Sequence, residues 1–425
     1  MNPLLRKPVV AWALFDWANS AFATTVMVGF FPVFFKQYWA AGTPASESTF
    51  ELGMINGAAS LLVAVLAPFL GAVADRSGGR VWLLGAFTAL GAAATAALAL
   101  VGRGEWLMAA TVFAVASVGF SAANAFYDSL LLDVAEPAEF DRASSLGFAL
   151  GYLGGGVLFA LNVWMTLSPA TFGLSGATAA VQWAFVSVGL WWLIFTLPGL
   201  VWVRERRTRP VVPWRVAVRA ALAELWATTH EIRRYRVLAL FLVAYWLYID
   251  GVNTVAKMCV DYGLSLGFPQ SALIAALLIT QFVSFPAALA FGWLGSRIGA
   301  RGGVLVAIAV YIVATFGAYH MDSVGDFYWL AATVGLVQGG VQALSRSYFG
   351  SLVPAGKQGE FFGFYNMMGK FAAVLGPVLV GITALVSASP RAAILSIEVL
   401  FIAGGALLVY VGRVERPARA RGTAG

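Results

Sequence analysis

The chain has little charge, one cysteine and two histidines. Only 11% of its 425 residues are charged, whereas about 25% is usual in a soluble protein. Cys259 has no second cysteine with which to form an internal disulfide, and His230 and His320 lie far apart in the sequence. Because no spacing typical of a metal site occurs, we expect neither a metal ion nor any other cofactor.

Long apolar runs make up most of the chain. The chain is 60% hydrophobic and its mean hydropathy is +0.82. A helix needs roughly 20 apolar residues to cross a bilayer, and runs of that length follow one another along the whole chain. The sequence therefore predicts an all-α integral membrane protein. Its twelve expected transmembrane helices are residues 9–36, 52–74, 81–102, 105–130, 144–167, 179–203, 236–260, 271–295, 303–320, 326–350, 359–386 and 392–412.

The basic residues gather on one side of these predicted spans. The net charge is +7, and the positive side includes Arg6, Lys7, the segment 204–236 and the end of the chain from Arg413. The positive-inside rule then places both termini in the cytosol. This distribution indicates a lipid bilayer as the partner of the positive charge, not a nucleic acid. The opposite side offers only Lys36, Arg103, Lys257 and Arg391.

A long polar segment divides the predicted spans six and six. We expect an N-terminal lobe over residues 1–203, a basic cytosolic linker over 204–235, a C-terminal lobe over 236–414 and a cytosolic tail over 415–425. Within the linker, Trp214, Val218 and Leu222 recur at helical spacing, which predicts an amphipathic helix on the membrane surface. A plain tether between the lobes and a lipid-sensing segment both remain open.

One ten-residue turn occurs twice, at residues 71–80 and 292–301. The offset is 292 − 71 = 221 residues, and such a duplication is typical of transporters with two lobes around a central site. The leading glycines would let helices approach closely, and the later glycines would allow a positive φ. A basic short loop is the plainer alternative. We assign to a cytosolic gate Gly71, Asp75, Arg76, Gly78, Arg80, Gly292, Arg297, Gly299 and Arg301.

A second pattern, Asp-x-x-Asn-Ser/Thr, begins at Asp16 and again at Asp250. Ionisable groups deep in a membrane are functional candidates by default, because an unpaired charge there costs at least a few kcal/mol. Such groups could bind a zwitterionic solute or carry a proton, or each Asp could instead bond its own Asn and Ser/Thr neighbours. The candidate substrate or proton site comprises Asp16, Asn19, Asp250, Asn253, Lys370, Gln338, Gln342, Tyr248 and Asn366.

Asp128 and Arg346 occupy corresponding places near the inner ends of two predicted helices, and their charges are opposite. We expect them to belong to the cytosolic gate and not to contact the substrate. Two independent helix-end charges are the alternative.

The repeated turn is similar to the cytosolic signature of the major facilitator superfamily. That resemblance implies two six-helix lobes and a turn that latches them in the outward-facing state; Ser296, where the signature has an acid, makes such a latch one-sided. Residues 12–25 resemble the first helix of the vacuole-effluxer group, also called the unknown major facilitator family. Supporting segments are residues 248–254, 338–347 and 360–366. This closer resemblance implies a relation to autophagy-related amino acid exporters.

Taken together, these patterns predict a secondary active or facilitative transporter of a small polar solute, with amino acids as one class. It would work by alternating access around a site between the lobes. We expect a monomer in a bacterial cytoplasmic (inner) membrane and no enzyme activity, and a coupling proton is left open. One alternative is a non-transporting sensor or scaffold that keeps the fold. The other, a membrane-embedded lipid enzyme, lacks a clustered catalytic set.

Overall fold

The computed structural model describes residues 3–41, 69–74, 79–206, 235–354, 356–372, 375–387 and 390–420, and no strand occurs within these ranges. Helices in the first half of the chain are α1 (Lys7–Ala21), α2 (Phe31–Phe34), α4 (Arg80–Ala97), α5 (Trp106–Val134), α6 (Phe140–Leu167) and α7 (Ala177–Trp202). Those of the second half are α9 (Arg236–Ser265), α10 (Gln270–Ile298), α11 (Ala300–Tyr319), α12 (Val324–Gly350), α13 (Gln358–Phe371), α14 (Leu375–Ser387), α15 (Pro390–Leu395) and α16 (Glu398–Ala420).

In the described ranges, nine helices are long and apolar enough to cross a membrane. The protein is therefore an all-helical integral membrane protein, as expected, and the count of twelve spans stays a prediction. Most of the expected span 52–74 lies outside the described residues, and so does the predicted amphipathic helix at 207–234. Helix α16 continues to Ala420, into the segment expected as a tail.

The first membrane helix contains two segments of wider π-helical turns. Residues Phe22–Phe30 and Phe35–Trp39 have this geometry, on either side of the short α2. π-Helical turns are rare and are frequently found at functional sites. The first of these segments supplies Thr24 and Val28 to the cavity described below.

Within the expected span 359–386, the described helices are α13, which ends at Phe371, and α14, which begins at Leu375. Pro377 is the third residue of α14, and proline is tolerated in a first turn, where its missing N–H would have no partner within the helix. The expected span 392–412 is confirmed as part of one candidate membrane span, Arg391–Glu415, within which α15 ends at Leu395 and α16 begins at Glu398.

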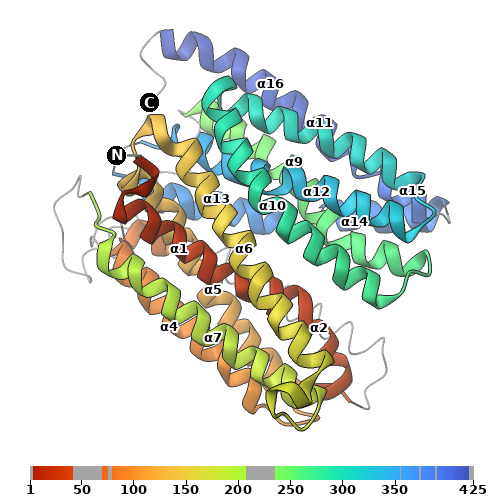
Figure 1. Cartoon of the computed structure of the whole chain (residues 1–425). Helices are drawn as coiled ribbons and strands as arrows, with labels where there is room; N and C mark the ends of the chain where they lie inside the picture. Colours follow the sequence, from red (N-terminus) through yellow and green to blue (C-terminus); the bar gives the residue numbers. More distant parts are fainter. Residues whose placement is uncertain are drawn as a thin grey trace.

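The buried apolar residues form separate clusters in the two halves. One cluster draws its buried members from residues 237–411, and two others draw theirs from residues 18–192 and 9–203. Between the halves, α6 packs against α10 and α12, and α5 packs against α13. Figure 1 shows that α1 begins and α16 ends at the same end of the bundle, which we call the terminus end.

Candidate functional site

A central cavity of about 360 Å³ lies between the two halves. Its apolar wall includes Phe120, Phe148, Val255 and Leu277. A concave site with apolar walls and a few polar groups is typical of small-molecule binding. Its polar lining comprises Asp16, Asn19, Ser20, Thr24, Asn124, Tyr152, Thr280, Gln281, Gln338 and Gln342.

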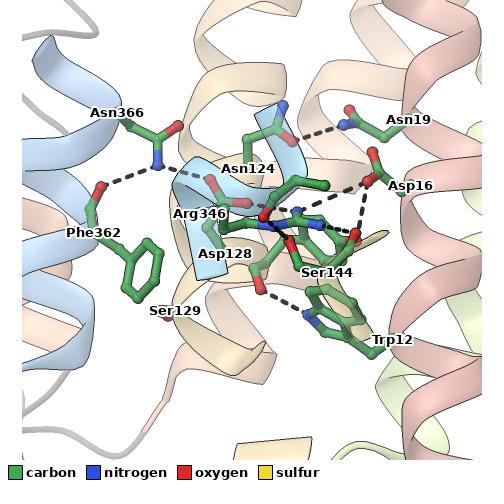
Figure 2. Close-up of polar contacts among 12 residues, drawn as sticks. Trp12, Asp16, Asn19, Asn124, Asp128, Ser129, Ser144, Arg346, Phe362 and Asn366 are labelled. Carbon is green, nitrogen blue, oxygen red and sulfur yellow. Dashed lines mark hydrogen bonds and ion pairs between the residues drawn. The ribbon is translucent and has the colours of Figure 1, made fainter. Parts of the chain in front are cut away.

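Arg346 of α12 extends from the second half into the first and is 1% exposed. Its Nη1 donates to Asp128 Oδ1 at 2.9 Å, and the same nitrogen lies 3.8 Å from Asp16 Oδ2. Its Nε and Nη2 donate to the hydroxyl and the carbonyl of Ser144, at 2.9 and 2.8 Å. Figure 2 shows these side chains converging on one guanidinium. The predicted opposite charges thus form a buried ion pair that joins the two halves.

Aromatic rings surround the same guanidinium. Its central carbon lies 4.3 Å from the ring centre of Phe148, 4.9 Å from that of Trp12 and 5.0 Å from that of Tyr127. The Tyr127 hydroxyl donates to Asp16 Oδ2 at 3.1 Å, and Trp12 Nε1 donates to the Tyr127 carbonyl at 2.8 Å. Planar stacking and forked hydrogen bonding are properties of arginine that lysine lacks.

One asparagine extends this set, which we call the Arg346 network. Its members are Arg346, Asp128, Asp16, Ser144, Tyr127 and Asn366. Asn366 of α13 donates to Asp128 Oδ2 at 3.0 Å, so both carboxylate oxygens of Asp128 accept from the second half. Asn19 donates to Asn124 Oδ1 at 2.8 Å beside the network (Figure 2). A second cavity of about 210 Å³ shares Asp16 and Gln342 with the central one and is also lined by Asn253, Asp128, Arg346 and Asn366.

Further contacts join the halves between the network and the terminus end. The Ser144 hydroxyl donates to the Ala343 carbonyl at 2.7 Å, and the Ser347 hydroxyl donates to Asp141. Arg142 donates to the Ser296 hydroxyl at 3.3 Å. Ser296 is the residue that replaces the acid in the second copy of the repeated turn.

The leading glycine of each turn packs against the opposite half. A Cβ atom on Gly71 would overlap the backbone of Gly359, and one on Gly292 would lie 2.6 Å from the Cβ of Ser145. The predicted close approach of backbones is confirmed, since neither position has room for a side chain. Gly299 has φ +81° and ψ 150°, a backbone region that only glycine adopts readily.

The arginines of the turns contact residues of their own half. Arg80 pairs with Asp133 at 2.9 Å and lies 3.6 Å from Glu205, whereas Arg301 pairs with Glu415 at 3.0 Å. Arg297 is exposed and lies 5.1 Å from the Trp293 ring centre. Asp75, Arg76 and Gly78 lie outside the described residues.

Asp250 is not among the described residues that line the central cavity. It is fully buried, and its carboxylate accepts from the backbone N–H groups of Leu375 and Gly376 at 2.9 and 3.1 Å. Thr254, four residues on, also donates to it at 3.3 Å. Asp250 therefore caps the start of α14. Its bond with Thr254 is the kind of neighbour bonding that the sequence left open as an alternative.

The remaining candidates take different positions. Gln338 and Gln342 line the central cavity, and Tyr152 donates to Gln342 Oε1 at 2.9 Å. Tyr248 is buried and its hydroxyl shares a hydrogen bond with Ser345 at 2.7 Å. Asn253 donates to the Ala372 carbonyl at 3.2 Å. The side chain of Lys370 lies outside the part of the chain that the structure describes.

Sequence reasoning missed Tyr127, Ser144 and Gln281. Gln281 of α10 donates to Thr24 in the first half at 2.6 Å. Each missed residue has a side chain common in any membrane helix, and only its position beside the other half gives it a role. One available signal was the dipeptide Gly-Phe, which occurs at residues 147–148 and again at 363–364. Its first copy lies in the turn of α6 that follows Ser144.

A protein-family model described as "Vacuole effluxer Atg22 like" matches residues 52–139 and 133–421. An uncharacterised transporter of the major facilitator type, YxiO of Bacillus subtilis, is 38% identical over 414 residues, which are 97% of this chain and 96% of YxiO. Autophagy-related protein 22 of Yarrowia lipolytica is 27% identical over 280 residues. That alignment spans 57% of this chain and 45% of the yeast protein.

Solved structures share the fold at low sequence identity. The human organic anion transporter MFSD10 superposes with a TM-score of 0.71 at 16% identity, covering 95% of this chain and 99% of its own. FucP, a major facilitator transporter in the outward conformation, gives 0.70 at 12% identity, covering 97% and 99%. These likenesses support the arrangement of helices. They do not identify the solute, which has to be inferred from the residues of this chain.

Proposed function

Because this chain belongs to the vacuole effluxer Atg22-like family of the major facilitator superfamily, we propose that it moves a small polar solute, amino acids among the candidates, across a bacterial cytoplasmic membrane by alternating access. The observation that carries this proposal is a cavity between two halves whose contacts concentrate on one side of it. We propose that the Arg346 network forms the gate on that side and that the described conformation is outward-facing.

Chemistry favours a gate that opens reversibly. A buried ion pair gains little net stability over apolar packing, because desolvation of the two charges opposes their attraction. Hydrogen bonds between the halves can therefore exchange for contacts with water at modest net cost when the halves rock apart. A central site then faces each side in turn.

Reconstituted protein tests the proposal. Proteoliposomes containing the purified chain should accumulate or exchange at least one labelled solute from a panel of amino acids, sugars and small peptides, whereas protein-free liposomes should not. The Arg346→Met variant, inserted to the same level, should lose most of this flux because its gate lacks the central cation.

The rival classes give different results in the same experiment. A sensor would bind a solute without flux, and a lipid enzyme would convert its ligand into a product that chromatography detects. Either result in correctly folded protein contradicts the transport proposal. An imposed pH gradient tests the open question of a coupling proton, because a proton-coupled carrier concentrates solute only while that gradient persists.

A further inference from the structure

We propose that Asp16 and Asn19 form a subsite for a protonated primary amine, so that the solute binds in the central cavity through an ammonium group. This inference rests on the proposed function and names the chemical class of its solute. It starts from the orientation of two asparagine side chains, which the hydrogen bonds of the cavity wall determine.

The orientation of Asn124 follows from a backbone carbonyl. Asn124 lies 3.0 Å from the Phe120 carbonyl oxygen, which can only accept, so the amide nitrogen of Asn124 faces it. The Oδ1 of Asn124 must then face Asn19, and Asn19 presents its own nitrogen there at 2.8 Å. This chain of donors and acceptors leaves Oδ1 of Asn19 as an acceptor.

That acceptor is buried and unused within the described part of the chain. Asn19 is 2% exposed, and its Oδ1 atom accepts no hydrogen bond from any described residue. A buried polar atom without a partner costs about 1–3 kcal/mol. Asn19 lines the central cavity, so a donor that reaches Oδ1 from this cavity would remove this cost.

The second acceptor is the carboxylate of Asp16, three residues earlier on α1. Residues three apart lie on the same face of a helix, with Cβ atoms about 5–6 Å from each other. Figure 2 shows both side chains projecting from this helix toward the Arg346 network. Asp16 is the only charged side chain in the described lining of the central cavity.

Charge balance favours a cation over a neutral donor. Among the described residues the Arg346 network holds two carboxylates, Asp16 and Asp128, and one guanidinium. Asp128 is the nearer partner of Arg346 at 2.9 Å, whereas Asp16 lies at 3.8 Å. One negative charge is thus left in excess on the side that faces the cavity.

The shape of the cavity favours an organic cation over a bare metal ion. About 360 Å³ is far more space than one ion fills, and Phe120, Val255 and Leu277 offer an apolar wall to the body of a solute. An ammonium group has three donors, enough for Asp16, Asn19 and one neighbouring hydroxyl or amide. A solute carboxylate would instead meet the negative charge of Asp16 and the acceptor Oδ1 of Asn19.

Occupancy of the subsite would also act on the gate. The Asp16 oxygen that faces Arg346 accepts from Tyr127 as well. An ammonium group at Asp16 competes with Arg346 for the same carboxylate and leaves Asp128 as the main anionic partner of the arginine. Binding would thereby weaken one of the two attractions that draw Arg346 into the first half.

Three ligands with one branched body test the chemistry. Isobutylamine, isobutanol and isovalerate carry an ammonium, a hydroxyl and a carboxylate at pH 7, and binding to the purified full chain is measured by calorimetry and by thermal shift. We expect isobutylamine to bind at least tenfold more tightly than the other two. Equal or tighter binding of isobutanol or isovalerate overturns the subsite, and so does a sodium-dependent thermal shift with none from the amine.

Variants locate the binding. Asp16→Asn and Asn19→Leu should each weaken isobutylamine binding at least tenfold. Asn162→Leu is the matched control, because Asn162 is 1% exposed, accepts from Ser187 and lies outside the described cavity lining. If Asp16→Asn does not fold, Asn19→Leu against Asn162→Leu decides the question. Equal losses in these two variants contradict the assignment.

Failure of this inference differs from failure of the transport proposal. Flux of labelled solutes with no preference for the amine removes the subsite and keeps the transporter. Amine binding that depends on Asp16 and Asn19, in protein that moves no solute of the panel, overturns the transport proposal on which this inference rests.

Discussion

At the scale of single residues, Arg346 makes several kinds of contact between the two halves. It contacts two carboxylates, both polar groups of Ser144 and three aromatic rings. Every one of these partners belongs to the first half, whereas the arginine belongs to the second. A change at Arg346 therefore affects the stability of the fold and the contact between the halves together.

Replacing Arg346 tests this dual role. Arg346→Met leaves the Asp16 and Asp128 carboxylates without their cation, and breaking a buried pair in this way costs about 3–5 kcal/mol. We expect a clear fall in melting temperature that the double variant Arg346→Met/Asp128→Asn partly reverses, since it removes one carboxylate. Simple additivity of the two single effects would show that the pair is not energetically coupled.

At the scale of elements, the break between α13 and α14 is set by a residue far away in the sequence. Asp250 on α9 accepts from the first two backbone N–H groups of α14. The carboxylate also lies at the positive end of that helix dipole, which stabilises a negative charge. A buried Asp in a membrane helix is thus accounted for by helix capping.

Conservative and apolar substitutions at Asp250 test whether this residue caps α14 or binds the solute or a proton. Asn is as good an N-cap as Asp, and loss of a cap costs about 0.5–2 kcal/mol. The single amide oxygen of Asn can replace only one of the two carboxylate oxygens that accept from α14. We therefore expect Asp250→Asn to melt somewhat below the parent chain and to keep transport, and Asp250→Leu to melt lower still. If Asp250→Asn folds normally but transports nothing, the carboxylate itself is needed and the sequence-based assignment to the substrate or proton site is right.

At the scale of the whole molecule, the two halves contact each other at the leading glycines of the repeated turn. Gly71 and Gly292 occupy equivalent places in the repeated turn, and each lies against the backbone or Cβ atoms of the other half. Ser347, whose hydroxyl donates to Asp141 beside Gly292, is 2% exposed, whereas Val28 on the wall of the central cavity is 52% exposed. These exposures support the proposal that the terminus end is the closed end.

Thiol labelling in a background without Cys259 measures which end is open. We expect Val28→Cys to react with a charged thiol reagent added on the side opposite the terminus end. Ser347→Cys should not react with the reagent from either side. Adding Gly292→Val should expose Ser347→Cys from the terminus side, because the new side chain would overlap Ser145 and separate the halves. Gly317→Val is the control, since a Cβ there meets nothing within 4 Å. Equal labelling in both glycine variants would contradict this role of Gly292.

Much of the architecture could be predicted because hydropathy is a local property. The lengths of apolar runs identified most of the membrane helices, and the spacing within the repeated turn identified Gly71, Gly292 and Gly299 with their physical roles. The corresponding places and opposite charges of Asp128 and Arg346 led to a prediction that both belong to the gate, whereas their direct ion pair came only from the structure. The end of α13 at Phe371 and the division between α15 and α16 could not be predicted, because hydropathy continues past both points.

The sequence by itself determined that this protein is helical, membrane-embedded and internally duplicated. The length of an apolar run and the spacing of a repeat are properties of the local sequence and do not depend on tertiary contacts. Only the tertiary structure decided what each buried carboxylate does. Asp16 and Asp250 open the same sequence pattern, yet one lines a cavity beside an arginine and the other caps a helix. The function of a buried charge depends on which helices meet around it, and that is a property of the packed chain.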